Sequence, residues 1–214
     1  NQPMNSKLKR LTLVAALAGS LVSLTACFPL LVGGAVGGAL VATDRRTSGS
    51  VVEDEGIEQR AASRIRENLG DRVHVNVTSY NRQVLLSGEV PTAQDKQLVE
   101  QIVSRVDNVR NIVNELGVMG NASLTQRTSD SLVTGRVKAA LVDAKDLFAN
   151  AFKIVTERGT TYVMGRVTER EAKRATDVIS STSGVQRVVR ILEIISEDEL
   201  ARLQPAPPPA EPKK

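Results

Sequence analysis

The sequence predicts an α+β fold that is repeated twice along the chain. Aliphatic residues four positions apart, as in Ala61, Ile65 and Leu69, indicate the buried face of an amphipathic helix. Alternating apolar and polar residues in 73–77 indicate a strand, and a second strand is expected at 84–90. The same order of segments returns between residues 128 and 196. We therefore expect a domain duplication rather than a solenoid, whose units are shorter and need at least three copies.

The two copies align on their second predicted strands. Gly88 falls on Gly165 and Val90 falls on Val167. Downstream, the aliphatic positions of the last strand coincide: Val109, Ile112, Val113 and Leu116 align with Val185, Val188, Val189 and Leu192. Upstream, Ala61, Ile65 and Leu69 are placed on Val133, Val137 and Leu141. This placement requires a few extra residues in the second copy, expected as a loop at 143–150.

Each copy is expected to run helix, strand, strand, helix, strand. The strands are predicted at 73–77, 84–90 and 111–116, and again at 152–154, 161–167 and 188–195. Thr92 and Thr168 are expected to open the second helices. The run Thr168-Glu169-Arg170-Glu171 matches a capping box, in which hydroxyl and carboxylate satisfy backbone donors reciprocally. We therefore predict a three-stranded mixed sheet in each copy, with two helices packed on one of its faces.

The N-terminal part of the chain has the pattern of an export signal. Lys7, Lys9 and Arg10 precede an apolar stretch at 11–24, which is too short to span a bilayer as an ordinary helix. It ends in Leu24-Thr25-Ala26-Cys27, which resembles the bacterial lipobox. In a lipobox the cysteine receives the acyl anchor, so Cys27 is the expected lipidation site. By resemblance to the sorting rule of lipoproteins, Phe28 after the cysteine favours the outer membrane.

The two predicted αββαβ units behind a lipobox resemble BON domains. The most specific stretch is 163–173, Val-Met-Gly-Arg-Val-Thr-Glu-Arg-Glu-Ala-Lys, followed by Ser183-Gly184-Val185. The layout is similar to that of the DolP family of dual-BON outer-membrane lipoproteins. The expected divisions are a signal peptide at 1–26, a lipidated N-terminus and linker at 27–56, BON domains at 57–118 and 128–196 joined by a linker at 119–127, and a proline-rich disordered tail at 197–214.

Composition argues against several function classes. The chain has three Phe, two Tyr and no Trp, which disfavours the base-stacking surfaces of single-strand nucleic-acid binders. One Cys and one His leave little material for a zinc site or a nucleophilic centre. His74 is expected on the solvated face of its strand, and Glu169 and Glu171 at a helix N-terminus for dipole reasons. We therefore expect no enzyme, no cofactor, no metal and no small-molecule substrate.

Charge is distributed unequally between the two predicted domains. Residues 57–118 carry eight basic and eight acidic residues, whereas 128–196 carry eleven basic and eight acidic ones. On the second helix of the second copy, Arg170, Lys173 and Arg174 are expected on the side away from the core. The resemblance implies a phospholipid-binding module, so these cations are candidate contacts for anionic lipid. The complete candidate set is Leu132, Arg136, Arg166, Arg170, Lys173, Arg174 and Asp177.

Alternatives remain for these residues and for the whole chain. Leu132 either enters a lipid headgroup layer or packs against the other domain or the linker, and the basic helix face either contacts lipid or is merely solvated. The leading interpretation is a periplasm-facing lipoprotein whose second domain binds anionic phospholipid and supports outer-membrane integrity. The first alternative is an adaptor for outer-membrane assembly proteins that uses exposed strand edges. The second is a structural spacer with an extended proline-rich tail.

Overall fold

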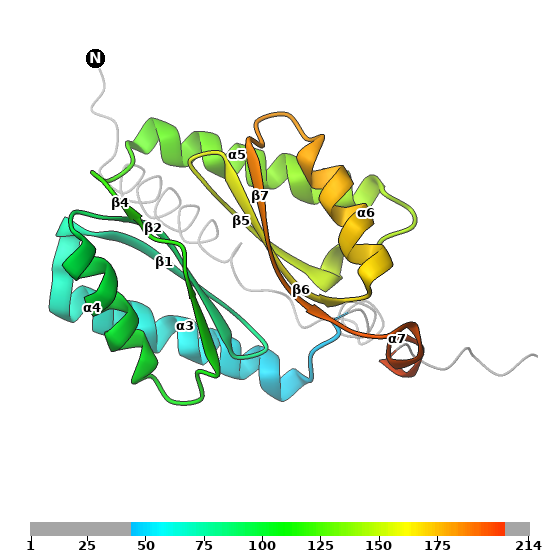
Figure 1. Cartoon of the computed structure of the whole chain (residues 1–214), viewed down its shortest axis with the longest axis horizontal. Helices are drawn as coiled ribbons and strands as arrows, with labels where there is room; N and C mark the ends of the chain where they lie inside the picture. The colour runs from blue at the N-terminus through cyan, green and yellow to red at the C-terminus, as the bar shows by residue number, and fades with distance from the viewer. Residues whose placement is uncertain (1–43, 204–214) are drawn as a thin grey trace, which may run out of the picture. The chain divides into compact units, whose positions relative to one another are not determined.

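The computed structural model describes residues 44–203, which contain both copies of the repeat within one compact unit, Ala39–Lys214 (Figure 1). The first domain contains α3 (Ser48–Leu69), η2 (Gly70–Arg72), β1 (His74–Tyr80), β2 (Gln83–Val90), α4 (Ala93–Ser104), β3 (Asn111–Asn114) and β4 (Gly117–Val118). The second contains α5 (Leu124–Asp143), η3 (Ala149–Ala151), β5 (Phe152–Glu157), β6 (Thr160–Val167), α6 (Glu169–Ser180) and β7 (Arg187–Ile194), followed by α7 (Glu197–Leu203). The predicted αββαβ order is confirmed in both domains.

Both sheets are mixed, as expected. In the first domain β2 pairs with β1 antiparallel and with β3 parallel, and in the second β6 does the same with β5 and β7. The third strand of the first domain is split, because β3 ends at Asn114 and pairing with β2 resumes in β4. The Asn114 side-chain oxygen accepts a hydrogen bond from the Leu116 N–H at this break, so the backbone there bonds locally instead of continuing the ladder.

One hydrophobic core lies between the helices and the sheet of each domain. In the first domain the core is built on Ile57, Ala61 and Ile65 of α3 together with aliphatic residues of β2 and α4. In the second it is built on Val133, Val137 and Leu141 of α5 together with residues of β5, β6 and α6. Thr92 and Thr168 cap α4 and α6, and the capping box of Thr168 and Glu171 is confirmed.

The predicted alignment of the two first helices is wrong by one helical turn. Asp54 of α3 accepts hydrogen bonds from the backbone N–H groups of Asn81 and Arg82 in the β1–β2 turn. Asp130 of α5 does the same for Arg158 and Gly159 in the β5–β6 turn. The equivalent pair is therefore Asp54 and Asp130, which places Ile57 on Val133.

Three consequences follow from this corrected register. Ala61 corresponds to Val137 and Ile65 to Leu141, and the expected insertion of several residues shrinks to one. The repeat counterpart of Leu132 becomes Gly56 instead of Arg60. The error arose because shifting an apolar stripe by one turn leaves its pattern almost unchanged.

The faces of the two sheets that the helices leave open pack against each other. A third apolar cluster joins Tyr80 and Leu85 of the first domain to Tyr162, Met164 and Ile191 of the second. Polar contacts surround this cluster, including hydrogen bonds from the Lys153 ammonium to Glu58 (2.6 Å) and from Asn81 to Glu193 (2.9 Å). The two domains therefore share an interface with an apolar centre and polar contacts around it.

The expected segment boundaries need adjustment at three places. Helix α3 begins at Ser48, so part of the expected linker 27–56 is helical, and α5 begins at Leu124, inside the expected linker 119–127. Residues 197–203, expected as the start of a disordered tail, form α7 with Leu200 buried. The predicted signal peptide, the lipidation site Cys27 and the tail residues 204–214 lie outside the described residues.

Candidate functional site

The outward face of α5 is the most apolar exposed helix surface of the second domain. Leu132 and Val142 are 58% and 63% exposed, and the small residues Gly135 and Ala139 lie between them on the same face. Arg136 and Lys138 are also exposed and flank this stripe. Val133, Val137 and Leu141 point the other way, into the core. We call Leu132, Gly135, Arg136, Lys138, Ala139 and Val142 the α5 face.

The cations of the α5 face are almost free of internal partners. Arg136 makes one long hydrogen bond, 3.5 Å, to the carbonyl oxygen of Ser183. Within residues 44–203, neither Arg136 nor Lys138 forms an ion pair with an acidic side chain. Leu132 does not pack into the domain interface, since more than half of it is exposed. The α5 face thus combines exposed apolar side chains with two cations that have no ion-pair partner within residues 44–203, and the exposed Asp143 at the end of the helix adds one negative charge to the same side.

The cations predicted on α6 are in a different state. Arg174 pairs with Asp146 (Nε–Oδ2 2.8 Å) and Arg170 pairs with Glu197 of α7 (3.2 Å). Lys173 is exposed, and no ion pair involves it in the described part of the chain. Asp177 is exposed on the same helix, where its carboxylate opposes binding of an anion. The sequence therefore identified exposed cations on α6 but could not show that two of them are already neutralised.

Arg166 lies near the end of β6 rather than on α6 itself. Its guanidinium pairs with Glu193 of β7 (3.2 Å) and with Glu199 of α7. Helix α5 packs against α6, so Leu132, Arg136 and the α6 cations belong to neighbouring elements of one domain. Arg166 is set apart from them by its acidic neighbours. The candidate set is thus divided into a free part on α5 and a mostly paired part on α6 and β6.

A short segment before α3 ties the N-terminal side of the body to the second domain. We call residues 44–47 the strap. Arg45 is buried and forms a bidentate pair with the buried Glu171, with both N–O distances 2.7 Å. Arg46 binds Asp44 and Asp54 and lies 4.4 Å from the centre of the Tyr80 ring. Burial raises the pKa of Tyr80 to about 12. The strap was not predicted from the sequence, because Glu171, the partner of Arg45, lies 126 residues away.

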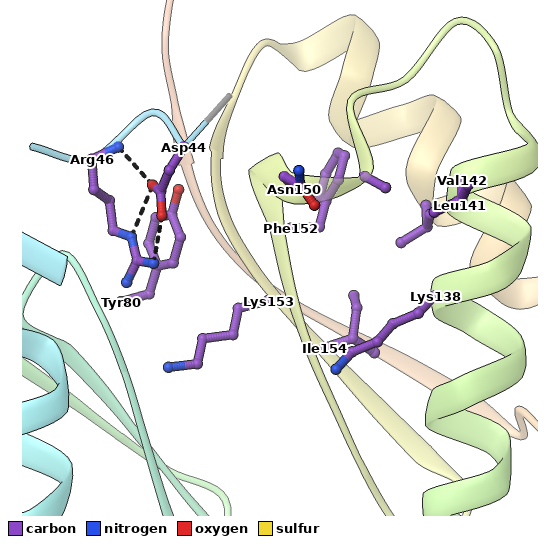
Figure 2. Close-up of a pocket in the computed structure, with 11 residues that line it drawn as sticks. Asp44, Arg46, Tyr80, Lys138, Leu141, Val142, Asn150, Phe152, Lys153 and Ile154 are labelled. Carbon is purple, nitrogen blue, oxygen red and sulfur yellow. Dashed lines mark hydrogen bonds and ion pairs between the residues drawn. The ribbon is translucent and has the colours of Figure 1, made fainter. Parts of the chain in front are cut away.

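A pocket of about 580 Å³ opens between the strap, α5 and β5 (Figure 2). Its apolar wall includes Leu141, Phe152 and Ile154, and its rim includes Lys138 and Val142 of the α5 face. Figure 2 shows the Lys138 side chain reaching from α5 toward the β5 side. This hollow therefore adjoins the α5 face.

A polar cluster lies at the domain interface around His74. The His74 Nδ1 lies 2.8 Å from the Glu89 carboxylate, and only 14% of the His74 side chain is exposed. The prediction of a solvated histidine is therefore wrong. His74, Glu89 and Glu157 place potential metal-ligand atoms within 4.8 Å of one another. However, Glu89 also accepts hydrogen bonds from Arg158 and from the Ala122 N–H, and Asn76 donates to Glu157. These contacts join the domains without requiring an ion.

The pKa values of Glu157 and Glu89, the two carboxyl groups of this cluster, are shifted in opposite directions. Burial raises the pKa of Glu157, and neighbouring Glu89 and Asp130 add to that rise. Burial also acts to raise the pKa of Glu89, but hydrogen bonds from Arg158 and His74 outweigh it and lower the pKa overall. Glu157 is therefore the electrostatically unfavourable member of the interface.

No helix among residues 44–203 is both long enough and apolar enough to cross a membrane. Among the described helices of the second domain, the three most exposed large aliphatic side chains all belong to α5. They are Leu124 in its first turn, Val142 and Leu132. This observation again singles out α5.

Comparison with known proteins gives two BON domain matches, at residues 53–120 and 129–195. The chain is 32% identical over 192 residues to the outer membrane lipoprotein DolP of Haemophilus influenzae, covering 89% of this chain and 98% of the relative. It is 27% identical over 154 residues to a 21 kDa hemolysin of Actinobacillus pleuropneumoniae, covering 71% and 79%. Among solved structures, CdsD of the Chlamydia trachomatis type III secretion system matches with 14% identity and a TM-score of 0.28, covering 72% of this chain and 96% of CdsD.

Proposed function

The chain belongs to the DolP family of BON-domain outer-membrane lipoproteins, and from this premise we propose that its second domain binds anionic phospholipid through the α5 face. The chain acts at the periplasmic side of the outer membrane and supports the integrity of that membrane. The observation that carries the proposal is the exposure of Leu132 and Val142 beside Arg136 and Lys138, which form no ion pair within the part of the chain that the structure describes.

The chemistry of the α5 face matches a lipid headgroup layer. A fully buried aliphatic side chain contributes about 1.5–3 kcal/mol, so two that are more than half exposed can gain a large part of this by entering the layer. Each cation close to an anionic surface adds about 1 kcal/mol. Gly135 and Ala139 allow the helix backbone to approach the surface closely. The α5 face therefore supplies both an apolar and an electrostatic contribution.

The cations of α6 have a secondary role in this proposal. Lys173 is available, but Arg170 and Arg174 must exchange Glu197 and Asp146 for a phosphate before they contribute. Such exposed pairs are weak, so the exchange costs little. An acyl anchor at Cys27 would hold the second domain near the bilayer, so that modest surface contacts become sufficient.

Vesicle binding with paired variants tests the proposal. The protein is residues 39–214, and the vesicles contain phosphatidylcholine with or without phosphatidylglycerol. L132S/V142S should weaken binding to anionic vesicles about tenfold, because both side chains are removed from the apolar contact. V52S/L98S is the matched control, since Val52 and Leu98 are exposed aliphatic residues on helices of the first domain. Equal binding by L132S/V142S and V52S/L98S would contradict a role for the α5 face.

An adaptor function is the second candidate. Val118 and Met119 are exposed at β4, which pairs only with β2 and therefore leaves a free strand edge in the first domain. An extended segment of an assembly protein could add to such an edge. Site-specific photo-crosslinking from position 118 in cells tests this candidate. Its outcome is independent of the vesicle experiment, because β4 and the α5 face lie in different domains.

A further inference from the structure

Helix α7 presents three consecutive acidic residues, Glu197, Asp198 and Glu199, directly after the last strand of the second domain. Two hydrogen bonds to Ser196 and one buried leucine fix the first turn of this helix. Ser196 accepts hydrogen bonds from the backbone N–H groups of Glu199 and Leu200, and Leu200 is buried. These contacts position the acidic turn at the end of β7.

Two of these acidic residues bind cations of the candidate lipid site. Glu199 pairs with Arg166, and Glu197 pairs with Arg170 at 3.2 Å. Helix α7 thus places carboxylates where the phosphate groups of an anionic lipid would have to lie in order to use these two arginines.

The contacts of α7 are suited to displacement. Arg170 and Glu197 are each more than half exposed, and ion pairs of this kind contribute little to stability. The helix has seven residues and buries one leucine, so little apolar area holds it down. A bilayer presents many phosphates at once, and this high local density favours exchange.

We propose that α7 is an intramolecular cover that competes with anionic lipid for Arg166 and Arg170. The inference rests on the proposed function and adds a regulatory step to it. Of the candidate residues, those of the α5 face and Lys173 have no acidic partner within residues 44–203 while α7 is in place. Displacement of α7 then releases Arg170, leaves Arg166 with Glu193 as its acidic partner, and strengthens the attachment where anionic lipid is dense.

Removing the acidic groups without changing their size tests the cover. E197Q/E199Q in residues 39–214 should bind phosphatidylglycerol vesicles about three- to tenfold more tightly than the unmodified protein, because the exposed Arg170–Glu197 pair and the partly buried Arg166–Glu199 pair no longer compete. The matched control is E67Q/D71N, which raises the net charge by the same amount in the first domain. Its gain should be smaller, since Glu67 contacts only Ser63 and neither residue touches α6 or β6.

The outcomes separate the cover from the lipid-binding function itself. A gain specific to E197Q/E199Q that disappears when R166Q/R170Q is added supports the cover. Tight binding of the unmodified protein with no extra gain for E197Q/E199Q over E67Q/D71N refutes the cover and leaves the lipid-binding function intact. No binding by any of these proteins refutes both.

Discussion

The buried pair between Arg45 and Glu171 should be the most sensitive electrostatic contact of the second domain. The perturbation is R45Q, which leaves Glu171 in its buried position with the Thr168 N–H as its remaining backbone donor, 3.0 Å away. Arg45 is 8% exposed and Glu171 1% exposed, so water cannot replace the lost partner. Breaking a buried pair by removing one member typically costs about 3–5 kcal/mol.

The retained capping contact places the expected loss at the lower end, about 3 kcal/mol. For a body of this size, that corresponds to a fall in melting temperature of roughly 6–12 °C. The measurement is urea and thermal unfolding of residues 39–214 at pH 7, monitored by circular dichroism. R187Q is the charge-matched control, because Arg187 forms an exposed 3.8 Å pair with Glu115 and its loss should be within about 1 kcal/mol.

The same contact predicts a pH dependence with a definite sign. Burial acts to raise the pKa of Glu171, but the hydrogen bonds from Arg45 and the Thr168 N–H, together with the nearby positive charges, outweigh it, so the net pKa lies below the ordinary value of 4.5. A carboxyl group with a lowered pKa in the folded state stabilises the protein above its unfolded pKa. This contribution is lost as the pH falls through the folded pKa. The difference between R45Q and the unmodified protein should therefore be full at pH 7 and shrink below pH 4.5.

Two results would refute this reasoning. One is a loss in R45Q no larger than that in R187Q. The other is a double variant R45Q/E171Q that is no more stable than R45Q, since removing the unpaired charge should restore stability.

Three further perturbations test other parts of the structure. D130N removes the charged acceptor of the Arg158 and Gly159 N–H groups. It should lower the free energy of unfolding, measured by urea titration, by about 1–3 kcal/mol. A change below about 0.5 kcal/mol would show that the β5–β6 turn does not need Asp130. G88A should prevent normal accumulation of folded protein, because its Cβ would lie 2.1 Å from the His74 carbonyl oxygen at a φ of +108°. G120A has free space around the added Cβ and should fold in the same expression assay. E157Q should stabilise the protein more at pH 7 than at pH 4. Burial raises the pKa of Glu157, so the unmodified protein loses stability as the pH rises above 4.5 through that raised pKa. A difference in unfolding free energy between E157Q and the unmodified protein that does not change with pH would argue against this explanation.

Much of the fold was predictable because local patterns and tertiary structure agree. Thr168 and Glu171 form the predicted capping box, and the strand positions around Gly88 and Gly165 align as expected. The first-helix register was not predictable from apolar spacing alone. Ala61 and Ile65 fit two alignments one turn apart, and the deciding residues are Asp54 and Asp130, whose turn partners lie 27 to 29 residues away.

The candidate site was predictable as a region but not in its electrostatic state. The exposure of Leu132 agrees with its expected outward position on α5. The ion partners of Arg170 and Arg174 come from distant segments that the sequence does not place in space. His74 lies on the sheet face away from the helices, as its alternation predicted, but the second domain covers that face and leaves only 14% of the His74 side chain exposed.

The most direct test of the central claim is a map of NMR chemical-shift changes for residues 39–214, titrated first with anionic and then with zwitterionic micelles. The proposed function predicts shifts at Leu132, Arg136, Lys138 and Val142, with smaller ones at Lys173, and only for anionic lipid. Shifts that are absent from α5, or equal for both kinds of micelle, would contradict recognition of anionic phospholipid by the second domain.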